Sequence, residues 1–575
     1  MPSTPNIGGN VPRRGELVMA KYVLVSDSTL MFDYRNFPLL DFLPCAPSSS
    51  IPRSLYYFLK GDVPRPLRNG QALLAPYPLR KLEASLLSCY SEKEVTVPHP
   101  DFLESFIRED TEVIGVSTMD PLGLGPLTMS YSALFGSNSY PWVRKEWEAL
   151  ISRLNTARRG TKAKILVGGP GVWEFMVFPD ELERLGIDFA YQGEVDDVAC
   201  MLFDQVYQGK LDPNVFTQGF MSFDDRFRRF YRPHGRFVSR KPSGRASPRV
   251  EEIASIVHPA CKGLNEVMRG CGIGCDFCEV TLRPLRYYSP ERVAQEVAVN
   301  AKYGGFTNAW LQTDEFFAYQ HGPLYTPNVD ALASLLSAVM SVRGVRSANP
   351  THGRISIPAA YPELIQKLSG IVHAGPSNWV GVQVGVETGS DRLAKIHMPN
   401  KTLPLRIGSD GAWPDIVWEG TRNFNRYFWR PAFTVQVGQE EEDPEDNWDT
   451  VALINRMSNS QVDGRPFEFT VTPMQHVPLG VLKSQSFSSN MLDESQLAVY
   501  YASYRHLAKM AARDSVKDSS GNPFVRMGTA GLIRFGGWVM MKVVESICRK
   551  RGLDIDRVKR YGLTGSTRTT SSVSV

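Results

Sequence analysis

Cys271-Gly-Ile-Gly-Cys275-Asp-Phe-Cys278 is the stretch that decides the fold and the chemistry of this 575-residue chain. Three cysteines at C-x3-C-x2-C spacing stand on a loop whose glycines let the backbone turn tightly. Three thiolates placed in this way can bind three corners of an iron–sulfur cube and leave its fourth iron without a protein ligand. An open iron of that kind allows a cluster to bind a substrate as well as to carry electrons.

The alternative for this loop is a closed four-cysteine site, for zinc or for a cluster, in which Cys261 supplies the fourth thiolate. Zinc ligands usually come as two C-x2-C pairs, and only Cys275 and Cys278 have that spacing. Cys548 is the only cysteine after the loop, so we expect one 4Fe-4S cluster and no auxiliary cluster. Because the N-terminus lacks a secretory signal, we expect clustered cysteines to bind metal more readily than to form disulfides.

The cysteine spacing resembles the signature of the radical S-adenosylmethionine (SAM) superfamily. That resemblance implies a partial (β/α) barrel with the cluster at the carboxyl mouth of the strands. It also implies that the open iron chelates the amino and carboxylate groups of SAM, which one-electron reduction splits into methionine and a 5′-deoxyadenosyl radical. The flanking sequence agrees, since Ser289-Pro290-Glu291 predicts a helix start, Gly304-Gly305 its end, and residues 308–312 a strand that follows.

Polar residues that end the next predicted strands are candidates for binding SAM. Val380 to Glu387 alternates apolar with small or polar residues, which puts Gln383 and Glu387 on one face of a strand. By resemblance to the family's SAM motifs, the candidate residues are Thr313, Asp314, Gln383, Glu387 and Gly438. The family's usual glycines before Glu315 are missing here. The alternative is an ordinary amphipathic strand with solvent-facing Gln and Glu, followed by an acidic helix start.

The N-terminal part predicts a doubly wound α/β domain. Apolar runs at 22–25, 113–116 and 165–167 read as buried parallel strands, and a helix follows Pro76 and Pro78. Such a domain ahead of a radical SAM barrel resembles the cobalamin-binding subfamily. The residues that match the subfamily's small-residue and closing-turn motifs are Ser117, Gly168, Gly169, Gly193 and Glu194.

The Asp-x-His-x-x-Gly motif of the classical cobalamin fold is absent, because none of the nine histidines stands in that context. The resemblance therefore implies cobalamin binding without a histidine ligand to cobalt from that motif. The alternative is a Rossmann-like docking domain that binds no ligand.

Composition divides the chain into expected parts. We predict a flexible N-terminus (1–20), a Rossmann-like cobalamin-binding domain (21–215), a basic linker (216–256), a radical SAM barrel (257–480), a helical C-terminal domain (481–561) and a disordered tail (562–575). The basic, aromatic run within the linker could bind RNA, but its Pro, Gly and Ser content favours a connector. The net charge of +4 gives no further argument for a nucleic-acid partner.

The resemblance implies a cobalamin-dependent radical SAM methyltransferase that acts on an unactivated carbon. In that subfamily, cob(I)alamin takes methyl from one SAM, and a second SAM gives the radical that removes a substrate hydrogen. We expect a cytoplasmic enzyme without a membrane span, an external electron donor of ferredoxin or flavodoxin type, and a peptide or protein substrate. By similarity to archaeal members of the subfamily, an example of such a substrate is a residue of methyl-coenzyme M reductase. The alternatives are a cobalamin-assisted cyclase or oxidase of a small metabolite and a four-cysteine zinc protein that binds nucleic acid.

Overall fold

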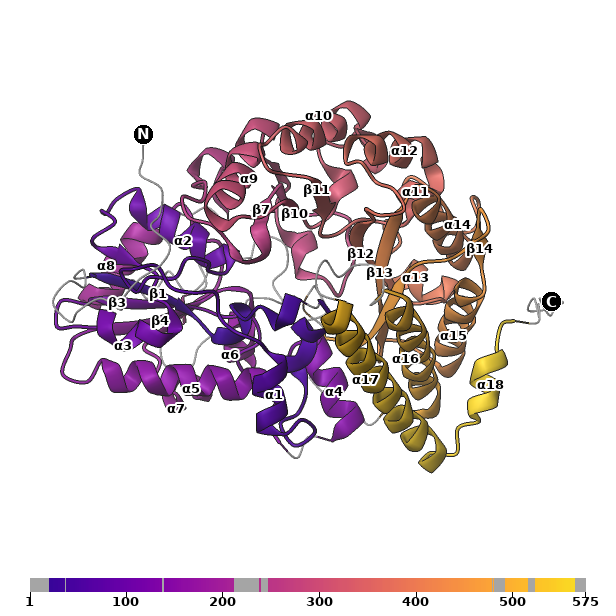
Figure 1. The fold of residues 1–575 in the computed structure, drawn as a ribbon, viewed down its shortest axis with the longest axis horizontal. Coiled ribbons are helices and arrows are strands. Elements are labelled where there is room, and N and C mark those ends of the chain that lie inside the picture. The colour runs from indigo at the N-terminus through magenta and orange to yellow at the C-terminus, as the bar shows by residue number, and fades with distance from the viewer. Residues whose placement is uncertain are drawn as a thin grey trace.

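The computed structural model describes residues 20–36, 38–136, 139–210, 237–238, 247–477, 479, 492–514 and 523–563. A six-stranded sheet with its helices lies beside a second group of strands made of two three-stranded sheets, and the C-terminal helices lie next to that second group (Figure 1). The expected flexible N-terminus up to residue 19, most of the expected linker and residues 564–575 of the expected tail lie outside the described residues.

The first sheet has the order β2-β1-β3-β4-β5-β6, and every pairing in it is parallel. All residues of β1 and β3 are buried, as the apolar runs predicted. The strands are β1 (Tyr22–Ser26), β2 (Val95–Thr96), β3 (Val113–Ser117), β4 (Lys164–Gly168), β5 (Phe189–Tyr191) and β6 (Phe237–Val238). The helices are α1 (Arg53–Leu59), α2 (Tyr77–Leu87), α3 (Leu103–Phe106), α4 (Pro126–Phe135), α5 (Trp142–Ala157), α6 (Trp173–Val177), α7 (Asp180–Arg184) and α8 (Ala199–Gln208).

Strand β6 corrects one expectation. Phe237–Val238 falls within the expected linker, yet it pairs with Ala190 and Tyr191 of β5. A two-residue strand is too short to leave an alternation pattern in the sequence, which is why composition alone assigned this segment to a connector. The sheet therefore draws its last strand from the basic segment.

The second set of strands forms a partial barrel. Parallel pairings join β7, β10 and β11 on one side and β12, β13 and β16 on the other. A parallel bridge between His352, just after β11, and Gln383, in the middle of β12, joins the two halves. The strands are β7 (Leu264–Glu266), β10 (Asn308–Gln312), β11 (Ser347–Pro350), β12 (Val380–Glu387), β13 (Trp429–Val437) and β16 (Thr470–Gln475). The expected α/β fold with a Rossmann-like sheet and a partial barrel is confirmed.

Helices cover the outside of this barrel (Figure 1). Ser289 caps the first of them, since its Oγ accepts the N–H of Arg292 at 3.3 Å, and Gly305 ends it in the left-handed region, as predicted. The helices are α9 (Pro290–Gly304), α10 (Val329–Met340), α11 (Ser356–Ala360), α12 (Pro362–Ile371), α13 (Asp391–His397), α14 (Trp413–Arg426) and α15 (Pro444–Ser458). Two short antiparallel ribbons complete it, β8 (Met268–Arg269) with β9 (Arg286–Tyr287) and β14 (Gln461–Val462) with β15 (Arg465–Pro466).

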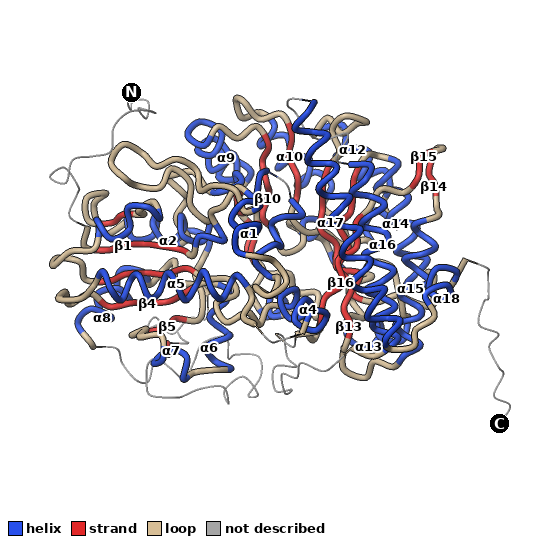
Figure 2. The backbone as a smooth tube through the Cα atoms, turned by 60° about the horizontal axis from the view of Figure 1, so that its bottom comes forward, coloured by secondary structure: helices blue, strands red, loops and turns tan. Residues whose placement is uncertain are grey.

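The C-terminal region is helical, as predicted, with α16 (Glu494–Asp514), α17 (Pro523–Lys550) and α18 (Ile555–Arg560). Figure 2 shows α16 and α17 alongside β13 and β16. His506 of α16 stacks on Phe469, with ring centroids 3.9 Å apart, so the helix packs directly beside β16. No helix in the described residues is long and apolar enough to cross a membrane.

Outside the cysteine cluster, Cys89 and Cys200 form a disulfide, which the sequence did not predict. Cys89 follows α2 and Cys200 lies in α8, so the two are 111 residues apart in sequence. Only the packing of α2 beside α8 brings them together. No local spacing in the sequence indicates such a pair.

Candidate functional site

The cysteine loop, Cys271 to Cys278, lies between β8 and β9 at the carboxyl end of the barrel strands. Gly270, Gly272 and Gly274 all have positive φ angles, of 81°, 71° and 93°. A Cβ on Gly270 would lie 2.6 Å from two backbone carbonyl oxygens, so a side chain cannot fit there. The glycines are therefore what lets the backbone curl around the three thiols.

The three loop thiols fit an iron–sulfur cluster. Cys271, Cys275 and Cys278 are free and interact electrostatically with one another. The backbone N–H of Ile273 donates to the Cys271 sulfur, and the N–H groups of Val280 and Thr281 donate to the Cys278 sulfur. Burial raises the pKa of all three thiols, that of Cys275 to about 12, and bound iron would remove their protons. Amide donors to the sulfurs are among the groups that set the potential of such clusters.

Cys261, the candidate fourth ligand, lies elsewhere. It precedes β7, whereas the cysteine loop comes after the carboxyl end of that strand. Its backbone N–H donates to Ala75 O at 2.8 Å, and its thiol interacts with Arg80 and Lys262. In the described part of the chain, no three His, Cys, Asp or Glu side chains are arranged to hold a single metal ion. The structure thus brings together the three loop cysteines and leaves Cys261 apart.

The polar residues after β10 contact the cysteine loop. Asp314 Oδ2 accepts the N–H of Gly270 at 2.8 Å, which ties the strand end to the residue before Cys271. Burial raises the pKa of Asp314, and the charge of Arg283 opposes that rise. Thr313 is fully buried beside it. These two candidates therefore lie at the loop, and their role toward SAM remains a prediction.

Gln383 and Glu387 lie on the same face of β12, as the alternation predicted. A Cβ on Gly385, the residue between them on that face, would lie 2.0 Å from Glu387 Oε1. Glu387 is buried and has a φ of 65° where β12 shifts register against β13, while Gln383 is exposed. The fifth candidate, Gly438, follows β13, and its N–H donates to Glu442 Oε2 at 2.8 Å. Four of the five SAM candidates thus lie at or just after the carboxyl ends of barrel strands, and Gln383 lies in the middle of β12.

Small residues line the carboxyl edge of the first sheet. Ser26, Ser117 and Gly168 are register partners at the ends of β1, β3 and β4. A Cβ added to Gly168 would meet no atom closer than 4.0 Å, so its α-carbon faces open space. Gly169 differs, because its φ is 100° and a Cβ there would lie 2.6 Å from Thr118 O. Gly168 therefore leaves room for a ligand, whereas Gly169 lets two strand ends pack closely.

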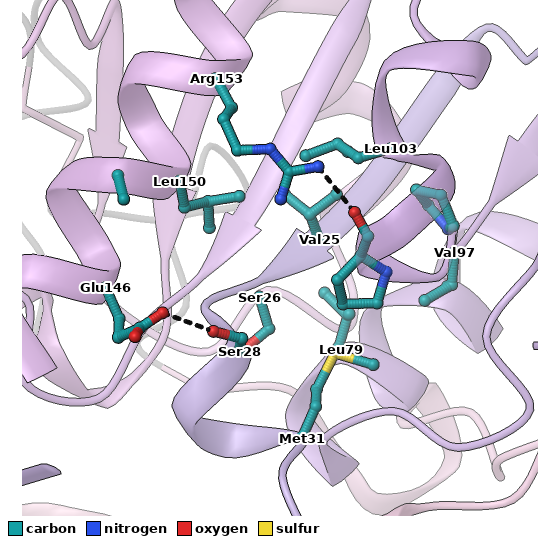
Figure 3. A pocket seen from close by; sticks show the side chains of 13 residues that line it. Val25, Ser26, Ser28, Met31, Leu79, Val97, Leu103, Glu146, Leu150 and Arg153 are labelled. Atoms are coloured by element: carbon teal, nitrogen blue, oxygen red, sulfur yellow. Dashed lines mark hydrogen bonds between the residues drawn. The ribbon is translucent and has the colours of Figure 1, made fainter. Parts of the chain in front are cut away.

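A pocket adjoins the same edge of the sheet (Figure 3). Val25 and Ser26 line it from the end of β1, and Leu150 lines it from α5. Arg153 closes one side by donating to Pro100 O at 2.7 Å, and Ser28 Oγ donates to Glu146 Oε2 at 3.0 Å on the other. The pocket is thus lined by apolar side chains with polar groups at its rim.

Glu194, predicted to bind cofactor, has its carboxylate engaged by two arginines of the barrel. Its oxygens accept from Arg286 at 2.6 Å each, and Arg269 Nη1 adds a contact of 2.9 Å. Arg269 also pairs with Asp196 and Glu266. Burial raises the pKa of Glu194, but these hydrogen bonds and charges outweigh that effect and lower the pKa to about 2. The Gly193-Glu194 turn, where Gly193 has a φ of 130°, therefore joins the first sheet to the strand that enters the cysteine loop.

A second contact joins the two parts between α2 and α9. Tyr77 Oη donates to Glu296 Oε2 and Lys81 Nζ to Glu296 Oε1, each at 2.6 Å, and all three side chains are buried. With the Glu194 contact, it joins the first sheet and its helices to the barrel. Sequence reasoning missed both contacts, because nothing in the local pattern identifies a partner so far along the chain.

Comparisons with known proteins found likeness in structure alone. No family model matches the chain, and no curated protein matches it. The radical S-adenosylmethionine methyltransferase TsrM from Kitasatospora setae, solved with cobalamin and a [4Fe-4S] cluster, aligns at a TM-score of 0.48 and 14% identity, over 81% of this chain and 77% of TsrM. TsrM solved with tryptophan and a SAM analogue gives the same score and identity, over 80% and 75%.

The cobalamin-dependent S-adenosylmethionine radical enzyme OxsB, solved with aqua-cobalamin and SAM bound, aligns at a TM-score of 0.51 and 11% identity. The alignment covers 94% of this chain and 76% of OxsB, so it includes both sheets and the C-terminal helices. At that identity the likeness concerns the fold. This chain has the α/β architecture of OxsB, with its cysteine loop at the mouth of the barrel.

Proposed function

We propose that this chain is a cobalamin-dependent radical SAM methyltransferase that methylates an unactivated carbon of a peptide or protein. One observation carries the proposal. Three free cysteines at C-x3-C-x2-C spacing converge on a glycine-shaped loop at the carboxyl end of a parallel barrel, against the carboxyl edge of a second parallel sheet. Enzymes built on parallel sheets bind ligands at the carboxyl ends of their strands. Two such edges facing each other suit two cofactors that act on one substrate.

The residues divide the work between these edges. Cys271, Cys275 and Cys278 would hold one 4Fe-4S cluster, and Thr313, Asp314, Gln383, Glu387 and Gly438 would orient SAM beside it. Ser117 and Gly168 would border the cobalamin, with Gly169 and the Gly193-Glu194 turn shaping the edge. When bound, these groups supply reductive cleavage of SAM and carriage of a methyl group, and the protein positions them and excludes water.

The first test concerns cobalamin. We expect Gly168→Phe to lower corrinoid affinity at least tenfold without lowering the melting temperature, because the new side chain fills open space rather than the core. Corrinoid retained after reconstitution and desalting, read from its visible spectrum, measures the effect. Gly370→Phe is the matched control, since a Cβ there also meets nothing within 4 Å but lies on α12 of the barrel.

Retention of corrinoid by Gly168→Phe would show that this glycine does not border the cofactor, and a wild-type protein that holds none would refute the proposal. The first sheet offers little for a cobalt ligand. His99 is the only histidine between residues 21 and 215, and its Nδ1 accepts the N–H of Asp101 in its own turn. Nitrogen hyperfine splitting from a protein imidazole in the EPR spectrum of cob(II)alamin would contradict the prediction that no histidine of the protein binds cobalt.

The second test concerns the reaction. With a low-potential reductant, methyl-labelled SAM and a peptide substrate, we expect S-adenosylhomocysteine and 5′-deoxyadenosine in about equal amounts per methyl transferred. Cys275→Ala should abolish 5′-deoxyadenosine, because only the reductive use of SAM needs the cluster. Quantitative chromatography with mass spectrometry checks both. Formation of 5′-deoxyadenosine while no label enters product would instead support a cyclase or oxidase of a small metabolite.

The proposal includes an external donor of ferredoxin or flavodoxin type and a cytoplasmic location, where such donors are found. The peptide or protein substrate rests on the resemblance described above. Nothing in the comparisons supports methyl-coenzyme M reductase in particular.

A further inference from the structure

A chain of hydrogen bonds runs across three strand ends and finishes at a lysine. Lys401 Nζ donates to Glu387 Oε1 at 2.7 Å, and Gln436 Nε2 donates to Glu387 Oε2 at 2.8 Å. Because Gln436 gives its amide hydrogen to the carboxylate, its Oε1 is the acceptor that faces His476 Nδ1 at 2.8 Å. The side chains of Lys401 and Glu387 are only 14% and 8% exposed. These hydrogen bonds hold the Lys401 ammonium in place through residues of β12, of β13 and of the segment just after β16.

The backbone is shaped to hold this pair. A Cβ on Gly385 would lie 2.0 Å from Glu387 Oε1 and 2.6 Å from Lys401 Nζ, so a larger residue there would displace the carboxylate and the ammonium from this arrangement. Glu387 takes a φ of 65°, which is unusual for a residue with a side chain. Such strain persists where the surroundings impose it, and it is concentrated at functional sites.

The held ammonium lies beside the cysteine loop. Its Nζ is 6.0 Å from the ring centroid of Phe277, which stands between Cys275 and Cys278. Its charge favours the thiolate forms of both cysteines, against the burial that raises their pKa values. For Cys275, Lys401 outweighs the opposing charge of Glu387. The loop therefore experiences a net positive contribution from the pair.

We propose that Lys401, positioned by Glu387, Gln436 and His476, stabilises the reduced state of the cluster held by the cysteine loop. This inference rests on the proposed function, since it requires a cluster there. Reduction adds one electron from the external low-potential donor, which is oxidised in return, and makes the cluster more negative. A fixed cation next to two of its thiolates favours that state, because net charge and surroundings set cluster potentials.

The test is an EPR-monitored redox titration of the reconstituted protein without SAM. We expect Lys401→Met to shift the equilibrium at least tenfold toward the oxidised cluster, which is about 59 mV for one electron. Glu387→Gln should shift the potential the other way, because the ammonium is then no longer offset by a carboxylate. Lys401→Arg should restore most of the wild-type value, and Lys395→Met, at an exposed lysine of α13, should leave it unchanged.

Opposite shifts for the two partners support an electrostatic role, since loss of structure alone would move both variants in one direction. Equal potentials in all variants would overturn the inference, and so would weaker SAM binding by Lys401→Met at unchanged potential, which would make Lys401 a ligand of SAM. If Lys401→Met cannot hold iron, the direction in which Glu387→Gln shifts the reduction potential still tests the inference. A wild-type protein without iron after reconstitution refutes the proposed function instead.

Discussion

Alanine at all three positions of the cysteine loop, Cys271, Cys275 and Cys278, should leave a folded protein that holds no iron. None of the three thiols forms a disulfide. The loop takes its shape from glycines with positive φ, which the substitutions leave in place. The reconstituted wild type should contain about four iron and four sulfide per chain, as one cubane requires. Colorimetric iron and sulfide analysis checks the loss, and far-UV circular dichroism checks the fold.

Cys261→Ala is the matched control for this experiment. It removes the one further cysteine that lies near the loop in sequence, and it should keep the full iron content. Loss of metal from the Cys261→Ala variant would support the alternative of a closed four-cysteine site. Iron well above four per wild-type chain would point to an auxiliary cluster, and iron retained by the triple variant would place the cluster elsewhere.

Much of the fold could be predicted because its signals are local. The buried runs of β1, β3 and β4, the Ser289 cap of α9 and the alternation in β12 each follow from a short stretch of sequence. The cysteine loop is equally local, since three thiols in eight positions must lie near one another. For such features, the spacing of residue types is enough.

The parts that could not be predicted depend on partners far apart in sequence. Lys401 follows α13 and shows no motif, yet it meets Glu387 because the barrel brings their segments together. Cys89 and Cys200 come close enough to form a disulfide only because α2 packs against α8. Glu194 looked like part of a cofactor turn, and its arginine partners, 75 and 92 residues further on, became visible only in the structure. Contacts of this kind are set by tertiary packing, which sequence periodicity does not report.

Removal of the Glu194 carboxylate should cost the protein more stability than any single surface charge. Glu194→Ala leaves Arg286, whose side chain is 9% exposed, without its bidentate partner, and weakens the Arg269 cluster. Breaking a buried ion pair by removing one partner typically costs about 3–5 kcal/mol, because the other charge stays buried and uncompensated. Chemical denaturation at pH 7 measures the loss. Because this carboxylate joins the two sheets, we also expect the variant to become more sensitive to proteases.

Glu104→Ala is the matched control. Glu104 also makes a two-pronged pair with an arginine, Arg153, at 2.7 and 3.0 Å, but both side chains are more than 40% exposed. Exposed pairs contribute about 0–1 kcal/mol, since water screens them. Similar losses in the two variants would mean that the Glu194 cluster is as well solvated as a surface pair, which would contradict the argument.

The pH dependence of stability gives an independent check on Glu194. Its pKa is about 2 in the folded protein and near 4.5 when the chain is unfolded. Between these values the unfolded state binds more protons than the folded state, so stability rises with pH. The contribution of Glu194 is complete above pH 4.5 and is lost as the pH falls toward 2. Glu194→Gln should therefore be less stable than wild type at pH 7, and this difference should narrow as the pH falls through that window. A difference in stability between Glu194→Gln and wild type that stays constant from pH 4.5 to pH 2 would show that the arginines of the barrel do not hold the carboxylate.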